Sequence, residues 1–305
     1  MALKDLIPFG MSLPHRSPDS IHMDAVRTVA MRAEGRGFRD LWVTENTLDH
    51  VTSFDPVVIL TYAAAVTTRI GLGASVLVLP VHDPRLVAYQ WASLDAVSNG
   101  RALMGVGIGR AQHLQEFQIA EAGRIARFRE QIELIRALWG QRKVSHHGRF
   151  YQLDNAGLGI RPVQQPMPIW MGAGHPDAIR RAAVLADGWM GAGGSSTDDF
   201  RRAVPLLRQA LEKAGRDPAS FPISKRIFIS VDDDPETART ELHRWYSEVY
   251  HNPAGTDTSG IHGTPEHVAE RLEAMVALGA NHLLLNPVAR HVEQLDALAE
   301  VVGLT

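Results

Sequence analysis

The sequence alternates short apolar runs with longer amphipathic segments, and this alternation occurs eight times along the chain. Runs of this length are typical of buried strands, whereas apolar residues spaced three and four apart indicate helices. The predicted strands are residues 6–12, 40–44, 70–79, 102–108, 168–172, 188–191, 223–231 and 282–286. Eight strand–helix units predict a (β/α)8 barrel of the α/β class, with a doubly wound sheet as the alternative.

Local signals support the helices and mark two insertions. Asp55-Pro56 and Asp83-Pro84 each place a capping carboxylate before a proline at the first helical position. An alternating stretch at 143–153 predicts a β-hairpin after the fourth strand, and residues 251–263 form an insertion before the eighth. With these insertions, we expect one domain over residues 1–305, although length alone would also allow two.

Composition excludes several kinds of chemistry. The chain has no cysteine, so disulfides, thiolate-bound zinc, iron–sulfur clusters and thiol nucleophiles are ruled out. Its net charge of −3 is spread without acidic or basic blocks, which argues against nucleic acid and anionic membranes as partners. The longest nearly uncharged apolar run, residues 70–81, is too short to cross a bilayer, and no signal peptide is recognisable. We therefore expect a cytoplasmic protein.

Common catalytic motifs do not fit this sequence. A metal-dependent barrel hydrolase needs a histidine pair after its first strand, where only His15 occurs, and His146-His147 lacks further ligands at metal spacing. No metal is therefore predicted. The glycine run 105–109 lacks the third glycine of the dinucleotide fingerprint, because Arg110 takes its place. The sequence also lacks a Walker A motif and a complete nucleophile elbow.

A phosphate-type site is predicted after the fifth strand. The strand ends in Gly172-Ala-Gly-His175, and a helix begins at Pro176. Small residues allow backbone N–H groups to approach a ligand, and the helix start adds the positive end of its dipole; an ordinary tight turn is the alternative. Small residues also fill the third strand at 71–75, where glycine indicates a bulge or a flat ligand against the backbone. Together these features predict a flat, phosphorylated cofactor.

Several longer motifs occur together in the chain. They are Gly37-Phe-Arg-Asp-Leu-Trp-Val-Thr-Glu45, Arg69-Ile-Gly-Leu-Gly-Ala-Ser-Val-Leu-Val-Leu-Pro80, Leu94-Asp-Ala-Val-Ser-Asn-Gly-Arg101, Ala186-Asp-Gly-Trp189 and Gly263-Thr-Pro-Glu-His-Val268. Through them the chain resembles the bacterial-luciferase-like family of flavin- and deazaflavin-dependent oxidoreductases over almost its whole length. The resemblance implies a luciferase-like (β/α)8 barrel, usually a homodimer packed through helices near the second and third strands.

The resemblance also implies a cofactor and the residues that hold it. The cofactor would be coenzyme F420, with FMN as the alternative, bound non-covalently. The Ser75-Val76 bond would be the family's non-prolyl cis peptide, which backs the middle ring, and Gly107 would lie beneath the ring system. The cofactor-binding residues that follow strands five and six would be Gly172, Ala173, Gly174 and His175, which hold the phosphate through their amides, and Trp189 nearby.

Two positions depart from the family pattern. Many deazaflavin-dependent members end the second strand with Asp-His, where this chain has Glu45-Asn46, and its sugar-phosphate dehydrogenases carry a glutamate where this chain has Arg110. An asparagine can hydrogen-bond to a carbonyl but cannot supply a proton at pH 7. The candidate catalytic residues are therefore Asn46, Glu45 and His50, the last ranked before the other loop histidines, His15 and His113.

The predicted function is that of an oxidoreductase acting on a small organic substrate. With coenzyme F420 it would transfer hydride, whereas with FMN it would be a monooxygenase supplied by a separate flavin reductase. One alternative is a non-catalytic flavin- or ligand-binding relative of the family. A metal-independent aldolase is a poorer fit, because its strand lysine, Lys225, would lie near the N-terminal end of the seventh strand.

Overall fold

A closed barrel of eight parallel strands forms the centre of the computed structural model, which describes residues 2–304. The strands follow one another around the barrel in chain order, and β7 pairs with β10 to close it. They are β1 (Phe9–Ser12), β3 (Asp40–Val43), β5 (Gly71–Ala74), β7 (Ala102–Gly107), β10 (Ile169–Gly172), β11 (Gly188–Gly191), β12 (Ile223–Val231) and β14 (His282–Pro287). The predicted (β/α)8 fold is confirmed, and the doubly wound alternative is excluded by the closure.

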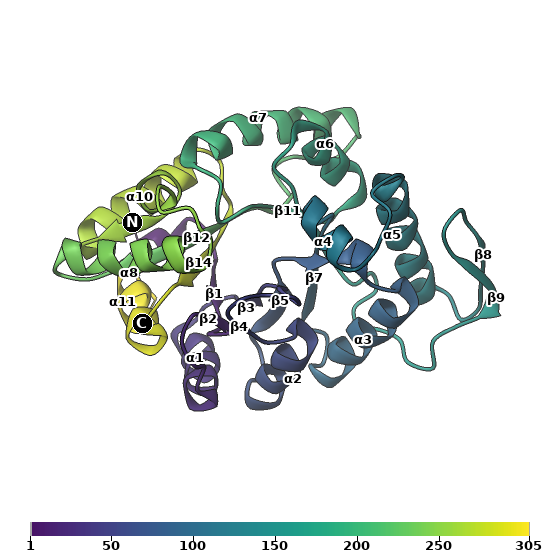
Figure 1. Cartoon of the computed structure of the whole chain (residues 1–305), viewed down its shortest axis with the longest axis horizontal. Coiled ribbons are helices and arrows are strands. Elements are labelled where there is room, and N and C mark those ends of the chain that lie inside the picture. The colour runs from purple at the N-terminus through teal and green to yellow at the C-terminus, as the bar shows by residue number, and fades with distance from the viewer. Residues whose placement is uncertain (1, 305) are drawn as a thin grey trace.

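The helices surround this barrel (Figure 1). The long ones are α1 (Met23–Arg36), α2 (Pro56–Val66), α3 (Pro84–Val97), α5 (Arg124–Gly140), α6 (Pro176–Leu185), α7 (Thr197–Lys213), α8 (Pro235–Glu248), α10 (Pro265–Ala277) and α11 (His291–Val302). The predicted caps are present: Asp55 accepts from the N–H of Val58 at 3.0 Å, and Asp83 accepts from that of Arg85 at 2.8 Å. Both helices therefore begin where the sequence predicts.

Trp42 occupies the middle of the barrel and explains several glycines around it. Its indole packs against Trp170, Met190 and Leu284, which come from three other strands. A Cβ atom on Gly73 would overlap this indole, and one on Gly10 would lie 2.8 Å from its Nε1. These strands therefore carry glycine because a large side chain fills the interior.

The third barrel strand is interrupted, so the prediction of one continuous strand over 70–79 is corrected. A cis peptide bond between Ser75 and Val76 separates β5 from β6 (Leu77–Val78), which continues the pairing with β7. The cis bond implied by the resemblance is confirmed.

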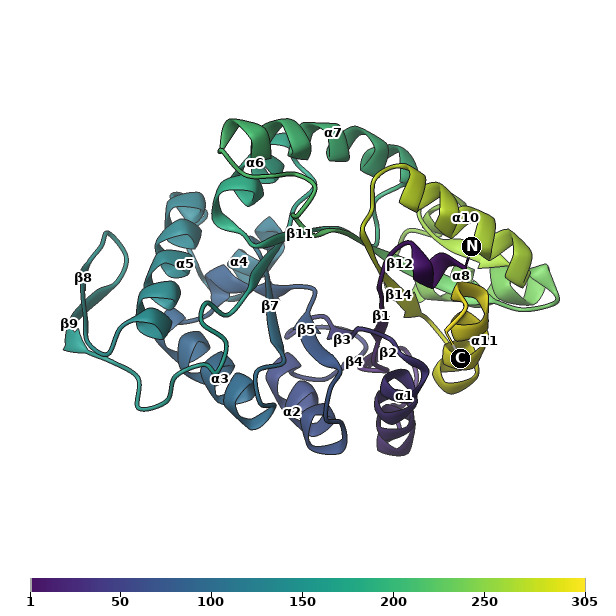
Figure 2. The ribbon, with the colours of Figure 1, turned by 180° about the vertical axis from the view of Figure 1, so that it is seen from behind.

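Shorter elements lie in the connections between the barrel strands and helices. The predicted hairpin is formed by β8 (Val144–His147) and β9 (Gln152–Ala156), which extend beyond α5 in Figure 2. Several short elements in the loops have no counterpart among the predicted ones. These are β2 (Arg16–Ser17), β4 (Thr52–Ser53), α4 (Ala111–Glu116), α9 (Gly255–Thr258), β13 (Ile261–Gly263) and the 3-10 turns Leu3–Asp5 and Leu79–Val81. Within residues 2–304, the helices lack the length and apolar character needed to span a membrane.

Candidate functional site

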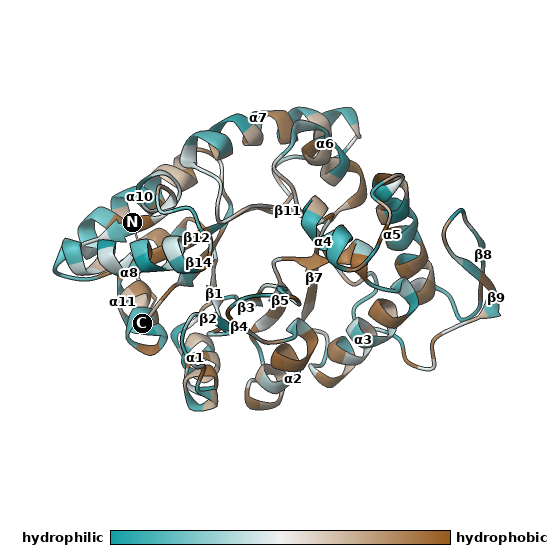
Figure 3. Ribbon diagram, viewed as in Figure 1, coloured by the Kyte–Doolittle hydropathy of each residue, from teal (hydrophilic) through white to brown (hydrophobic). Residues whose placement is uncertain are grey.

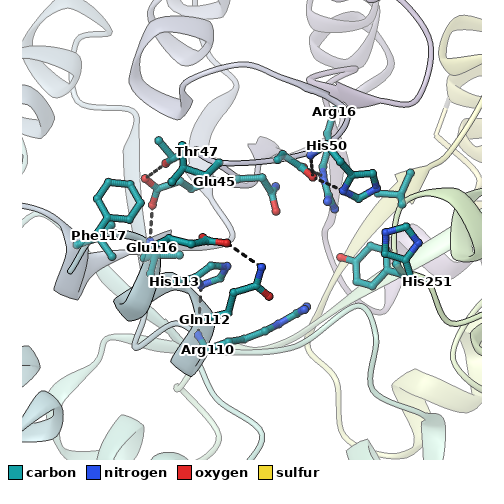
Figure 4. A pocket seen from close by; sticks show the side chains of 17 residues that line it. Arg16, Glu45, Thr47, His50, Arg110, Gln112, His113, Glu116, Phe117 and His251 are labelled. Atoms are coloured by element: carbon teal, nitrogen blue, oxygen red, sulfur yellow. Dashed lines mark hydrogen bonds and ion pairs between the residues drawn. The ribbon is translucent and has the colours of Figure 1, made fainter. Parts of the chain in front are cut away.

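Two pockets lie side by side at the C-terminal ends of the barrel strands. The smaller, of about 250 Å³, is lined from the loops after β1, β3, β6 and β7 and from the end of α8 (Figure 4). The larger, of about 810 Å³, lies at the ends of β10, β11 and β12. Arg110 and Tyr250 line both, so the two pockets meet there. This is the face at which barrel enzymes place their chemistry.

The turn between β10 and α6 forms one wall of the larger pocket. Gly174 and Pro176 line the pocket, and a Cβ on Gly174 would meet nothing within 4 Å. The backbone N–H groups of Gly174 and His175 have no acceptor among the described residues. An anion placed here would receive these hydrogen bonds together with the positive end of the helix dipole.

Trp189 supports this turn from behind. Its indole is 1% exposed, stacks on Phe200 with ring centres 5.6 Å apart, and lines neither pocket. The indole Nε1 donates to the carbonyl oxygen of Ala173 at 2.9 Å. The residue therefore fixes the orientation of the Ala173 peptide group.

The cis peptide lies in the third barrel strand, and the side chain of Val76 packs against the ends of β7 and β10. A Cβ on Gly107 would lie 2.6 Å from Val76 Cγ2, and one on Gly172 would lie 2.8 Å from Val76 Cγ1. Both glycines are thus required by this valine. Ser75 is also buried, and its hydroxyl donates to Met190 Sδ at 2.7 Å.

Glu45 has both carboxylate oxygens engaged. Oε2 accepts from the N–H of Val78 at 2.5 Å, while Oε1 accepts from the Thr47 hydroxyl at 2.9 Å and lies 2.6 Å from His82 Nε2. Its side chain is 4% exposed. The carboxylate therefore ties the loop after β3 to the segment that follows the cis peptide.

Asn46 lines the smaller pocket at the end of a hydrogen-bonded chain. Its Nδ2 donates to Thr44 Oγ1 at 2.9 Å, and Thr44 Oγ1 lies 2.8 Å from His15 Nε2. His15 Nδ1 lies 2.7 Å from the carbonyl oxygen of Leu13, which can only accept. His15 is buried, and this burial lowers its pKa to about 3, so the ring stays neutral. These hydrogen bonds fix the orientation of the Asn46 amide. His15 itself supplies no proton to the pocket.

His50 lies at the rim of the smaller pocket, as Figure 4 shows. Its Nε2 lies 2.7 Å from the carbonyl oxygen of Glu248, and its ring stacks on His251 with centres 4.6 Å apart. Its Nδ1 lies 3.1 Å from Asp49, which also pairs with Arg16 at 2.6 Å. His113 lines the same pocket from α4. The structure therefore brings Glu45, Asn46 and His50 to one pocket.

Sequence reasoning missed the residues that come from distant loops. Tyr250, His251, Gln112 and Glu116 line the smaller pocket, and Arg226 lines the larger one. The only signal for Arg226 is a charged residue, next to Lys225, inside a predicted strand. The loop residues had no such signal.

Lys225 lies near the N-terminal end of β12, as the sequence predicted. It pairs with Leu283 near the start of β14 and with Gly191 at the C-terminal end of β11. Its Nζ donates to the carbonyl oxygen and hydroxyl of Ser195, at 2.9 and 3.0 Å, and to the carbonyl oxygen of Ala192. Burial lowers the lysine pKa to about 7, with a further contribution from Arg226. The amine is held by these acceptors rather than aimed into a pocket as an aldolase lysine would be.

A serine–histidine–aspartate chain exists, but it is sealed inside the barrel. Ser224 Oγ lies 2.7 Å from His282 Nδ1, and His282 Nε2 lies 3.0 Å from Asp40. All three residues are at most 2% exposed. No substrate can reach the hydroxyl, so this network is structural. In the described part of the chain, no three histidine, aspartate or glutamate side chains are grouped to hold a metal ion.

Comparison with known proteins assigns the chain to a family. Residues 7–258 match the model of the luciferase-like monooxygenase family, and the chain belongs to that family. An F420-dependent glucose-6-phosphate dehydrogenase of Kineococcus radiotolerans is 33% identical over 227 residues, which cover 71% of this chain and 66% of that protein. A 5,10-methylenetetrahydromethanopterin reductase of Archaeoglobus fulgidus is 32% identical, over 68% of this chain and 60% of that protein. The chain thus aligns with about two thirds of the length of these relatives.

Solved structures agree on the fold. An F420-dependent secondary alcohol dehydrogenase, in complex with an F420–acetone adduct, superposes with a TM-score of 0.85 at 22% identity, covering 98% of both chains. The F420-dependent tetrahydromethanopterin reductase of Methanopyrus kandleri gives a TM-score of 0.82 at 18% identity, covering 98% of this chain and 99% of that one. The predicted family resemblance is confirmed.

Proposed function

We propose that this chain is an oxidoreductase that binds coenzyme F420 non-covalently and transfers hydride between it and a small organic substrate. The observation that carries the proposal is the β10–α6 turn, which leaves the N–H groups of Gly174 and His175 without acceptors on the wall of the larger pocket. An F420-dependent relative supports the same cofactor. Membership of the luciferase-like monooxygenase family is compatible with either F420 or FMN.

The residues at this turn fit a phosphorylated cofactor. Gly172, Ala173, Gly174 and His175 would hold the phosphate through their backbone amides, at the start of a ten-residue helix. Trp189 would keep the Ala173 peptide in place. When bound, a deazaflavin supplies a two-electron hydride acceptor or donor. Ser75, Val76 and Gly107 would form the surface behind its ring.

The smaller pocket would orient the substrate. Asn46 would hydrogen-bond to a substrate oxygen, with its amide held by Thr44 and, through it, by neutral His15. Glu45 would act as a positioning residue, because its carboxylate oxygens are already bonded inside the protein. We assign the proton exchange at the pocket rim to His50, whose imidazole lines the pocket. The exchange would use Nδ1, on the side of Asp49, because Nε2 donates to the carbonyl oxygen of Glu248.

Cofactor titration tests this proposal. The purified protein should quench the fluorescence of F420 on binding and bind FMN at least tenfold more weakly, and the reduced complex should not consume oxygen. Gly174→Val should weaken F420 binding at least tenfold, because the new side chain would occupy the space in which the phosphate binds. The fold should be unaffected, since a Cβ at this position meets no atom within 4 Å. Binding of neither cofactor, or unchanged affinity in Gly174→Val, would reject the assignment. Binding without hydride transfer to any substrate would favour the non-catalytic alternative.

We further infer that the chain is one domain, acts in the cytoplasm and forms a homodimer. The single closed barrel supports the first inference. Exposed apolar side chains on α2 and α3, among them Val58, Leu86, Tyr89 and Val97, support the third. A separate flavin reductase would be a partner only if FMN proved to be the cofactor.

A further inference from the structure

Arg226 is a buried charge that the proposed function leaves without a role. It lies on β12, is 9% exposed and lines the larger pocket. Its Nη1 reaches across the barrel mouth to the carbonyl oxygen of Ser75 at 2.8 Å, and its Nη2 donates to the Tyr250 hydroxyl at 3.1 Å. No carboxylate between residues 2 and 304 pairs with it, and its Nε is buried without a partner.

A second arginine of the same barrel shows what a purely structural guanidinium looks like. Arg101 also lacks a carboxylate at hydrogen-bond distance, yet it makes five hydrogen bonds to oxygen atoms of the surrounding turns, which use every nitrogen. A guanidinium has five N–H donors. Arg226 uses two of them: its Nε–H is buried without a partner, and Nη1 and Nη2 each keep one further N–H group for a ligand. An uncompensated buried cation with unused donors destabilises a fold, so its presence calls for a ligand.

The surroundings of Arg226 do not neutralise its charge. Lys225 is its neighbour in sequence, and Asp199, which lines the same pocket, pairs with Arg202 at 2.6 Å. Aromatic rings form the other side: the Phe228 ring centre lies 5.0 Å from the guanidinium carbon, and Tyr250 packs on Phe228 at the same centroid distance. The site thus offers one planar cation beside an apolar aromatic wall.

We propose that Arg226 binds the carboxylate of the substrate, and that the substrates of this chain are small organic acids. Such an acid would extend from Asn46 in the smaller pocket past Tyr250, where the two pockets meet, to Arg226 in the larger one. This proposal rests on the proposed function, because it names the substrate class of that site. Adjacent N–H groups of a guanidinium match the two oxygens of a carboxylate, and desolvated pairs of this kind are strong. Phe228 and Tyr250 hold the guanidinium plane, while the aromatic wall accommodates the apolar body of the acid.

A matched pair of probes tests the proposal without turnover. Benzoate and benzamide have the same shape and differ in charge, and each would be titrated calorimetrically into the protein. Wild type should bind benzoate at least tenfold more tightly than benzamide. Arg226→Met and Arg226→Gln should lose this preference. Arg32→Met, which removes an exposed arginine on α1, and Gly174→Val should both keep it.

Two further measurements separate the possible outcomes. Arg226→Gln keeps a neutral polar side chain at this position, so it covers the case in which the methionine variant fails to fold. Without benzoate, both variants should melt at or above the wild-type temperature, because they remove a buried unpaired charge. A lowered melting temperature combined with an unchanged benzoate preference would overturn the proposal, since Arg226 would then be structural.

Absence of any benzoate preference in wild type, or its loss in Gly174→Val instead, would also overturn the proposal. F420 titration of the same variants keeps this inference apart from the proposed function. If wild type fails to bind F420 but the Arg226 variants alone lose the benzoate preference, the cofactor assignment fails and the carboxylate site stands. If wild type binds F420 but shows no preference for benzoate, the cofactor assignment stands and the carboxylate site fails.

Discussion

At the scale of single residues, polar side chains in this barrel act mainly by fixing one another. His15 illustrates this: a histidine that the sequence offers as a possible proton donor is buried and neutral, and it orients Asn46 through Thr44. Its nitrogen atoms are committed to Leu13 and Thr44. The identity of the residue was visible in the sequence, but its protonation state depends on burial, which the fold sets.

Stability against pH tests the state of His15. Its folded pKa of about 3 lies below the ordinary value of 6.5, so the unfolded chain binds a proton that the folded chain does not. Below about pH 6.5 this group should therefore reduce the free energy of unfolding by up to about 1.4 kcal/mol per pH unit. Urea denaturation between pH 7 and pH 4.5 measures it. His15→Gln has no such titrating group. The difference in free energy of unfolding between wild type and this variant should therefore shrink as the pH falls. Parallel pH profiles for the two proteins would contradict the prediction.

At the scale of elements, some helices and strands are specified by neighbouring residues, and others depend on contacts between residues distant in the sequence. Asp55 and Asp83 start their helices through bonds within one turn, which is why the sequence predicts those starts correctly. The two-residue strands β2 and β4 pair across a separation of about 35 residues and carry no periodicity, so no sequence pattern announces them. The hairpin β8–β9 is an intermediate case, since its strands alternate visibly but its attachment depends on Glu130.

Glu130 should hold the hairpin to α5. Burial opposes ionisation of this carboxyl, but the N–H groups of Phe150 and Tyr151, at 3.0 and 2.8 Å, outweigh it and lower the pKa. Glu130→Ala should leave these donors unpaired, costing about 2 kcal/mol and speeding hydrogen exchange at residues 148–151. Hydrogen exchange with mass spectrometry measures the local effect. Glu133→Ala on the exposed face of the same helix is the control and should leave the exchange unchanged.

At the scale of the whole molecule, one face of the helical layer is unusually apolar. Figure 3 shows hydrophobic residues along α2 and α3. Leu86, Tyr89 and Val97 lie on α3 and are at least half exposed, as is Val58 on α2. Apolar stripes on neighbouring helices are typical of an interface between subunits. This observation supports the homodimer that the family resemblance implies.

Tyr89→Glu should disrupt such a dimer. A charge buried at the centre of an apolar interface without a partner weakens association by several kcal/mol, enough to give monomers at micromolar concentration. Sedimentation velocity would record the change in mass. Val184→Glu, at an apolar position on α6 that is even more exposed than Tyr89, is the control and should remain dimeric. A wild-type protein that sediments as a monomer would refute the prediction outright.

The sequence by itself determined the eight strand–helix units and the helix starts at Pro56 and Pro84, because each depends on neighbouring residues and their periodicity. The cis bond at Ser75-Val76 was implied by the family resemblance, and the closure of the barrel came from the structure. Tertiary structure alone decided what the pockets contain. The register of β12 places Arg226 at the wall of the larger pocket and Lys225 beside the C-terminal end of β11. The packing of the loops places Tyr250 and His251 in the same pocket as Asn46. Burial then decided their chemistry, since the charge a group carries and the donors it leaves unused depend on which atoms surround it.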